Sequence, residues 1–248
     1  MGAYLRRGAL AGLAGGAAMA IFLLAVGERS IRAALAIEAA RSSVSGEPSV
    51  EMFSRSTQVL GGVIAALLYG LFVGAIFGVV FAAVRHHSRL SDDFLRALGL
   101  GAVAFGTLVL VPALKYPANP PAVGDPATVG QRTVAYLTML AAAVTLALAA
   151  WRASRALRAR GLPDHVRLTV VAAGYVAAVA LAYVVWPANP DRVDVPATLL
   201  WRFRLASLGG AAALWSVLAA VFGWACVRAE ATRAGAGRAA GRTTGGAR

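Results

Sequence analysis

Residues 115–132, KYPANPPAVGDPATVGQR, form a proline-rich polar stretch between two long apolar runs. The stretch returns 70 positions later, where the YPANP of residues 116–120 is matched by the WPANP of residues 186–190. The shared pattern is PANP-x5-PAT-x3-R, which does not arise readily by chance in a chain with ten prolines. Internal repeats indicate repeated structural units. We therefore predict that each copy is the loop of a hairpin formed by two apolar segments.

Composition indicates the class of protein. Of the 248 residues, 59% are hydrophobic and 14% are charged, whereas soluble domains average roughly 25% charged residues. A membrane-spanning helix needs about 20 mainly apolar residues, and six segments meet that requirement. We predict an all-α integral membrane domain over residues 1–228 and a disordered basic tail over 229–248. The six predicted spans are 5–26, 57–84, 94–114, 133–151, 168–186 and 199–227.

Basic residues gather on one side of the predicted membrane. If both termini are cytoplasmic, the cytoplasmic segments hold 15 of the 24 basic residues but four of the 11 acidic ones. This is the positive-inside bias, so we predict cytoplasmic N and C termini. The net charge of +13 then serves contacts with anionic membrane lipids, and we expect no nucleic-acid binding. The first apolar run resembles a signal peptide, but its removal would spoil this asymmetry, so we expect it to be retained.

Glycines at four-residue spacing mark two of the predicted spans, from Gly8 to Gly16 and from Gly62 to Gly78. Such spacing lets helix backbones approach closely in membranes, so we predict close packing of the first two spans, with packing on each other as one arrangement. We interpret the six spans as three hairpins, each closed outside by a loop that ends in an arginine. The last two hairpins are the internal repeat. The first matches them only in hydropathy and in Arg55.

The repeated loops offer oxygen atoms without matching donors. Proline has no N–H and biases the preceding residue toward extended conformations, so these runs leave carbonyl groups free. With the side chains of Asn119 and Asn189, they are hard oxygen donors for a cation. Asp125 adds a carboxylate in the first copy and Asp194 in the second. Two loops related by a repeat would meet near a pseudo-twofold axis. The alternative, given equal weight, is that the loops are rigid caps between helices.

Residues 27–56 form the longest predicted external connector, and they contain two further candidate ligands. If this segment is helical, Glu28 and Glu38 share an apolar face. A carboxylate on such a face needs a partner or a cation. The plain interpretation pairs Glu28 with Arg32 and Glu38 with Arg41 on the helix surface. The functional interpretation makes both carboxylates metal ligands at an outer vestibule.

Arginines and histidines flank the spans. We expect the arginines near the loop tips to pair structurally with nearby groups, because a guanidinium that lined a cation path would repel the cation. These arginines are Arg55, Arg132, Arg202 and Arg204. On the cytoplasmic side, His86 and His87 could ligate a transition metal at the exit, although such a loop is more often simply solvated.

With these motifs in view, the chain resembles the CbtA family of predicted cobalt transporter subunits. The resemblance rests on four stretches and covers nearly the whole chain apart from the Arg/Gly-rich tail. The stretches are LKYP at 114–117 continuing through Pro126 and GQRT at 130–133, PATLLWRFRLASLG at 196–209, RGALAG at 7–12 and Gly27-Glu28.

The resemblance implies uptake of Co²⁺, with Ni²⁺ second, across the bacterial plasma (inner) membrane for cobalamin synthesis. It also implies a small one-span partner, CbtB, with a histidine-rich end. The predicted outer segments of this chain hold no histidine and offer oxygen ligands. The partner could add nitrogen ligands, which favour cobalt over magnesium or calcium. We expect no permanently bound cofactor, and a homo-oligomer is left open.

Other classes of function compete with transport of cobalt. The chain could be a non-transporting structural or assembly subunit of a transport complex. It could carry an organic cofactor precursor, which would need a large apolar cavity between the hairpins. An intramembrane enzyme would need clustered acids, histidines or serines within the spans, but the three histidines lie in predicted cytoplasmic loops. The Gly-Lys-Ser/Thr of an ATP-binding loop is missing from the sequence, so we expect neither an enzyme nor an ATPase.

Overall fold

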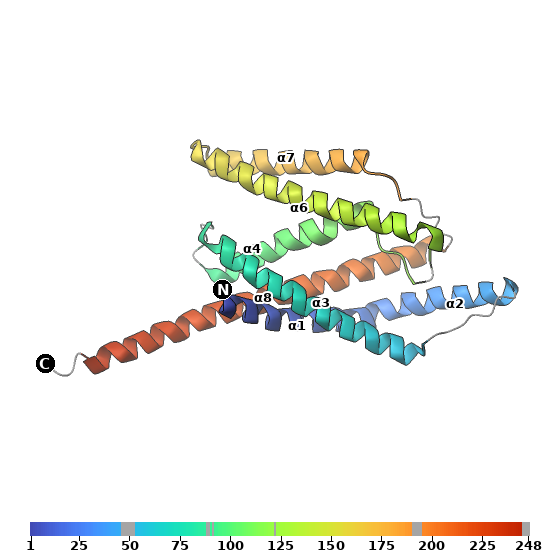
Figure 1. The fold of residues 1–248 in the computed structure, drawn as a ribbon, viewed down its shortest axis with the longest axis horizontal. Helices are drawn as coiled ribbons and strands as arrows, with labels where there is room; N and C mark the ends of the chain where they lie inside the picture. Colours follow the sequence, from blue (N-terminus) through green and yellow to red (C-terminus); the bar gives the residue numbers. More distant parts are fainter. Residues whose placement is uncertain (46–52, 88–89, 91, 122, 190–194, 245–248) are drawn as a thin grey trace. The chain divides into compact units, whose positions relative to one another are not determined.

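The computed structural model describes residues 1–45, 53–87, 90, 92–121, 123–189 and 195–244, which form helices and no strand (Figure 1). Two of the elements, η1 and η3, are π-helical turns, and η2 and η4 are 3-10 turns. In chain order the elements are α1 (Gly2–Phe22), η1 (Leu23–Gly27), α2 (Glu28–Ser45), α3 (Arg55–Val84), η2 (Arg85–His87), α4 (Asp93–Phe105), η3 (Gly106–Leu110), α5 (Val111–Lys115), η4 (Pro126–Thr128), α6 (Val129–Ala159), α7 (Asp164–Val185) and α8 (Ala197–Thr244).

In the part of the chain that the structure describes, six helical segments are long and apolar enough to cross a membrane, so the chain is a multi-pass membrane protein. The six agree in number and position with the predicted spans. The side of the membrane on which the termini lie stays a prediction. The segments are Gly2–Ser43, Arg55–His87, Asp93–Lys115, Pro126–Ala159, Asp164–Val185 and Ala197–Thr232.

Several helices continue past the apolar runs that predicted them. α6 ends at Ala159 and α8 at Thr244, and the predicted division of the chain at residue 228 stays a prediction. Alanine and arginine are frequent in both extensions and are good helix formers. Hydropathy predicts the part of a helix that is apolar enough to lie in a membrane. It does not predict the residue at which the backbone hydrogen bonding of the helix ends. The predicted connector 27–56 likewise begins as a helix, because α2 continues from α1 through η1 and ends at Ser45.

The third span is interrupted by a π-helical turn that hydropathy did not predict. Pro112 lies at the start of α5, where its ring lacks an N–H and crowds the carbonyl group four residues earlier. The backbone N–H of Val111 donates to the carbonyl oxygen of Gly106, a wider loop than that of an α-helix. The widened turn accommodates the proline while the helix continues to Lys115.

The chain divides into two compact units. The first comprises Met1–Val26, Val50–Val103 and Gly209–Arg248, and the second comprises Gly27–Ser49 and Ala104–Leu208. Each unit is described separately below.

In the first unit α1 and α3 pack with backbone against backbone (Figure 1). A Cβ atom added at Gly12 would overlap the carbonyl oxygen of Gly70, and one added at Gly8 would overlap that of Gly74. The predicted close packing of the first two spans on each other is thus confirmed. Gly62, at the far end of the predicted stripe, has open space around it.

From Gly209 onward α8 completes the core of the first unit. Leu218 and Phe222 are fully buried. The ring of Phe222 packs edge-on against those of Phe77 and Phe81 on α3, with centroids 5.2 and 5.0 Å apart. Aromatic pairs favour this geometry, so the C-terminal span is anchored to the glycine-packed pair.

Two helix contacts lie outside the predicted hairpins. α7 packs on α6, and the two lie side by side in Figure 1. The part of α8 beyond Gly209 packs on helices of the first unit, where Gly15 of α1 lies against Leu214 and Gly101 of α4 against Ala219. The pairing of the fifth and sixth spans as a repeated hairpin stays a prediction.

The core of the second unit lies where α5, α6 and α7 meet. It contains small side chains, which allow close approach, together with a few large ones. The buried members are Val111, Tyr116, Ala135, Met139, Ala143 and Ala182, with Leu146, Tyr175, Val179, Tyr183 and Trp186 packed against them.

Replacing Gly74 by alanine should destabilise the protein by about 1–3 kcal/mol, because the new methyl group meets the backbone of α1 and forces the helices apart. Thermal unfolding in detergent, followed by intrinsic fluorescence, measures the change. The matched control is Gly62→Ala on the same helix, where a Cβ meets nothing within 4 Å. We expect the control to be neutral or to gain up to about 1 kcal/mol of helix propensity. Equal melting temperatures for the two variants would contradict the proposed backbone contact.

Candidate functional site

The two copies of the repeated loop lie together in the second unit. The hydroxyl group of Tyr116 donates a 2.6 Å hydrogen bond to the carbonyl oxygen of Pro187. The ammonium group of Lys115, the only lysine, donates at 2.7 Å to the carbonyl oxygen of Tyr183. Residues 115–116 of the first copy are thereby attached to the second copy and to the helix end before it. The sequence predicted that the loops would meet, but it did not identify these contacts.

Two further contacts fix the aromatic residues around the loops. The hydroxyl group of Tyr183 donates at 2.6 Å to the carbonyl oxygen of Val111, directly before the proline of α5. The indole N–H of Trp186, the sequence counterpart of Tyr116, donates at 3.1 Å to the hydroxyl oxygen of Thr138 on α6. Tyr116 thus donates to a backbone carbonyl group, whereas its counterpart Trp186 donates to a side chain. The two copies differ in their hydrogen bonds.

Burial raises the pKa of the Tyr116 hydroxyl above its ordinary value. The group therefore stays protonated at neutral pH and keeps its role as a donor. The Tyr116 hydroxyl supplies a donor to the carbonyl oxygen of Pro187, at a loop where proline has removed backbone donors.

Arg204 reaches the first copy of the loop from α8. Its Nη2 donates at 3.2 Å to the side-chain oxygen of Asn119, and its Nε donates at 3.4 Å to the carbonyl oxygen of Ala118. Arg204 lies seven residues into α8, about 10 Å along the helix axis. The extended segment around Asn119 is therefore held by a side chain from near the start of α8.

Asp125 acts first as a helix cap. Its carboxylate accepts a 2.8 Å hydrogen bond from the backbone N–H of Ala127 at the start of η4, and its backbone carbonyl accepts from the hydroxyl group of Thr128. Arg132 donates at 3.5 Å to the same carbonyl oxygen. Asp125 is exposed. The carboxylate of Asp125 therefore has a capping role, and its binding of a cation stays a prediction.

The remaining predicted ligands are not gathered into one cluster. Nε of Arg32 donates a 2.9 Å hydrogen bond to Oε1 of Glu28, the surface ion pair that the sequence offered as one interpretation, and the Glu28 side chain is 12% exposed. Glu38 is exposed on α2, and Asn189 is half-buried in the second loop copy. Asp194 lies outside the described residues. Among the described residues there is no group of three or more His, Cys, Asp or Glu side chains that could hold a metal ion.

The other predicted residues lie at helix ends. Arg55 donates at 3.0 Å to the side-chain oxygen of Gln58 in the first turn of α3, and Arg202 is exposed on α8. His86 and His87 form the exposed turn η2 after α3. Arg204 makes a contact between separate elements, to Asn119, 85 positions away in sequence.

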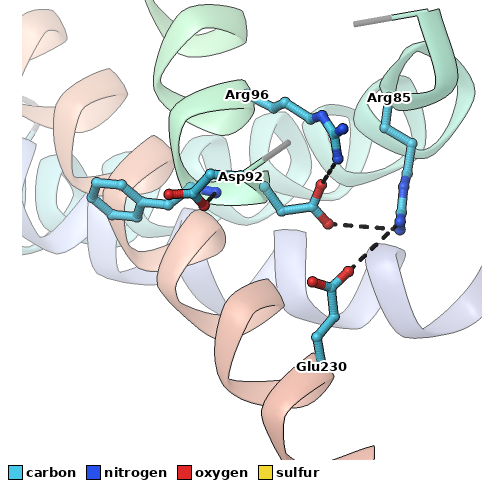
Figure 2. Close-up of polar contacts among 6 residues, drawn as sticks. Arg85, Asp92, Arg96 and Glu230 are labelled. Carbon is cyan, nitrogen blue, oxygen red and sulfur yellow. Dashed lines mark hydrogen bonds and ion pairs between the residues drawn. The ribbon is translucent and has the colours of Figure 1, made fainter. Parts of the chain in front are cut away.

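A charged cluster that the sequence did not predict lies within the first unit (Figure 2). The side chain of Asp93 is 1% exposed and lies between two arginines, 2.5 Å from Nη1 of Arg96 and 3.7 Å from Nη1 of Arg85. Nη2 of Arg85 lies 3.6 Å from the carboxylate of Glu230 on α8. The guanidinium of Arg85 also lies 5.3 Å from the ring centroid of Tyr4. The cluster therefore connects α1, η2, α4 and α8.

One feature of the sequence could have identified part of this cluster. Asp93 and Arg96 are three residues apart at the start of an apolar run, a spacing that pairs side chains on a helix. Asp92 caps the same helix through a 2.7 Å hydrogen bond from the N–H of Phe94. The contributions of Arg85 and Glu230 depend on tertiary packing and have no such signal.

Comparison with known proteins gives one match. A family model described as "Probable cobalt transporter subunit (CbtA)" matches residues 1–227. No curated protein and no solved structure matches the chain.

Replacing Tyr116 by phenylalanine should lower the free energy of unfolding by about 1–2 kcal/mol, because the carbonyl oxygen of Pro187 loses its donor. Thermal unfolding in detergent is the measurement. Tyr136→Phe, at an exposed position on α6, is the control and should melt as the unmodified protein does. If both variants melt alike, the bond between the loop copies contributes nothing.

Replacing Asp93 by alanine should destabilise the first unit by about 3–5 kcal/mol, because two arginines lose a buried partner. Glu230→Gln should cost less than about 1 kcal/mol, because the Glu230 side chain is 54% exposed and water screens the pair. Chemical denaturation of both variants in the same detergent gives the comparison. A Glu230 variant as unstable as the Asp93 variant would refute this ranking.

Proposed function

Because this chain belongs to the CbtA family, whose members are described as probable cobalt transporter subunits, we propose that it is the membrane subunit of a divalent transition-metal uptake transporter. The metal is Co²⁺, and the transporter supplies it to cobalamin synthesis across the bacterial plasma (inner) membrane. The observation that carries the proposal is the family match over residues 1–227, which spans all six membrane helices.

The repeated loops are the proposed entrance for the ion. In the first copy the carbonyl oxygen of Ala118 and the side-chain oxygen of Asn119 lie together within reach of Arg204 on α8. Asn189 and Asp125 lie in the same loops, with Asp194 as a further candidate, and Glu28 and Glu38 are proposed as outer ligands on α2. Oxygen ligands exchange a divalent ion readily, and conduction requires binding weak enough for the ion to leave.

Selectivity for cobalt is the part that oxygen ligands serve least well. Imidazole suits first-row transition metals, whereas carboxylate and carbonyl oxygen suit magnesium and calcium. A small one-span partner with a histidine-rich end, of the CbtB kind, would provide the nitrogen ligands. His86 and His87, both exposed on η2, are the proposed exit ligands of this chain, provided that this end is cytoplasmic as the charge bias predicts.

A second candidate function is a non-transporting structural or assembly subunit. Two observations favour it. The family is described as a subunit, and the oxygen of Asn119 at the proposed entrance accepts a hydrogen bond from the chain's own arginine. In this alternative the loops are rigid caps, and flux needs another membrane protein.

Uptake of radioactive Co²⁺ into proteoliposomes tests the proposal, with the full chain alone and with the small histidine-rich protein. We expect entry that nickel suppresses and magnesium does not. Asp125→Asn should lower uptake about fivefold, because it removes a negative charge at the entrance while asparagine keeps the helix cap. Asp92→Asn is the matched control, since it changes the same charge at another helix cap, and it should transport normally.

The outcomes separate the two candidates. Flux only in the presence of the partner would make this chain a permease subunit that is incomplete alone. No flux in either preparation, from well-folded protein, would rule out the transport proposal and leave the assembly role.

A further inference from the structure

The oxygen atoms of the repeated loops and their flanks are occupied by the chain's own cations. Lys115 donates to the carbonyl oxygen of Tyr183, Arg132 to that of Asp125, and Arg204 to that of Ala118 and to the side chain of Asn119. One interpretation of the sequence makes the loop carbonyls and the Asn119 side chain ligands of a cation. In the folded protein the oxygens of Ala118 and Asn119 accept hydrogen bonds from a guanidinium group.

The distances distinguish a fixed contact from a releasable one. Hydrogen bonds from nitrogen to oxygen in proteins are typically about 2.7–3.2 Å long. The bond from Lys115 to the carbonyl oxygen of Tyr183 is at the short end of that range, at 2.7 Å. The bonds from Arg204 are at and beyond its long end, at 3.2 and 3.4 Å, and Arg204 is half-buried with a long flexible side chain. Arg204 is therefore held less closely than Lys115.

We propose that Arg204 is a tethered competitor that occupies the oxygen site at Ala118 and Asn119 and must leave it when a divalent ion enters. The inference rests on the proposed function. It makes Arg204 a residue that determines which ion binds, and not one that only stabilises the loop. A guanidinium and a divalent ion cannot share two oxygens at this distance, because like charges a few ångströms apart repel strongly outside bulk water.

The competitor would discriminate between metal ions. An entering ion must displace a positive charge and also exchange part of its water shell for loop oxygens. Mg²⁺ gives up its bound waters reluctantly. The need to lose water and also to displace Arg204 therefore disfavours Mg²⁺ most strongly. A transition metal that is held at the same time by nitrogen ligands of a partner meets the requirement more easily. Loss of Arg204 should therefore strengthen ion binding and weaken the discrimination against magnesium.

Titration calorimetry with the full chain in detergent tests the proposal, using Co²⁺ and Mg²⁺ as the probes. Arg204→Gln removes the charge and keeps an amide that can donate to the same oxygens, and Arg204→Lys keeps the charge. We expect Arg204→Gln to bind both ions about tenfold more tightly than the unmodified protein, because a neighbouring positive charge is gone, with the larger gain for Mg²⁺. Arg204→Lys should bind as weakly as the unmodified protein.

Arg202→Gln provides the matched control. It removes the same charge from an exposed position on the same helix, two residues away, and it should leave both affinities unchanged. Equal affinities for Arg204→Gln and the unmodified protein, or equal gains in the Arg202 and Arg204 variants, would overturn the inference. Absence of metal binding in all variants would overturn it as well.

The failure of this inference is distinguishable from failure of the transport proposal. If proteoliposomes take up cobalt while Arg204→Gln binds metal as the unmodified protein does, transport stands and the competitor is rejected. If no cobalt enters but Arg204→Gln gains affinity over Arg204→Lys, the oxygen site and its competitor stand without transport. A melting temperature within a few degrees of the unmodified protein establishes that each variant is folded.

Discussion

The structure around the repeated loops depends on supplying donors to backbone oxygens that proline has left without them. An unsatisfied carbonyl group is costly wherever water does not reach it. The chain meets the need with side chains from distant positions: the hydroxyl of Tyr116, the hydroxyl of Tyr183, and the cationic groups of Lys115 and Arg204. The bond from Tyr116 joins the two loop copies, and the other bonds connect the first copy and the adjoining α5 to α7 and α8.

The first unit is built on a different principle, because lipid tails are as apolar as leucine and give helices no hydrophobic reason to associate. Close approach of backbones replaces that driving force where glycines of α1 meet glycines of α3. The aromatic rings of Phe77, Phe81 and Phe222 then attach α8 to the pair. The buried carboxylate of Asp93 is tolerated at one end of this unit because two arginines surround it.

The sequence predicted the structural features that depend on local composition and spacing. It did not predict those that depend on contacts between distant segments. It predicted six spans and close packing of the first two, and it offered the Glu28–Arg32 pair as one of two interpretations, since hydropathy, glycine spacing and i,i+4 charges are local. It did not predict the continuation of α8 to Thr244 or the π-helical turn before Pro112. Nor did it predict the pairing of α7 with α6, because a repeat in sequence does not determine which helix faces become complementary. The role of Arg204 depends on a contact across 85 positions, which no spacing pattern encodes.

The positive charge of the loops constrains what kind of metal site they can form. A tight site for a divalent ion gathers carboxylates or imidazoles, whereas the described part of these loops brings Lys115 and Arg204 to its oxygens. Each positive charge nearby weakens the binding of an entering cation. A weak site is nevertheless suited to an entrance, because an ion that binds tightly at the first site does not move on. Weak capture by oxygen then requires that selectivity come from elsewhere, and softer nitrogen ligands on a second subunit would provide it. Arg204 at the proposed entrance would lower the occupancy of the oxygen site by every cation. The proposed histidine-rich partner would restore that occupancy for the metals that imidazole prefers.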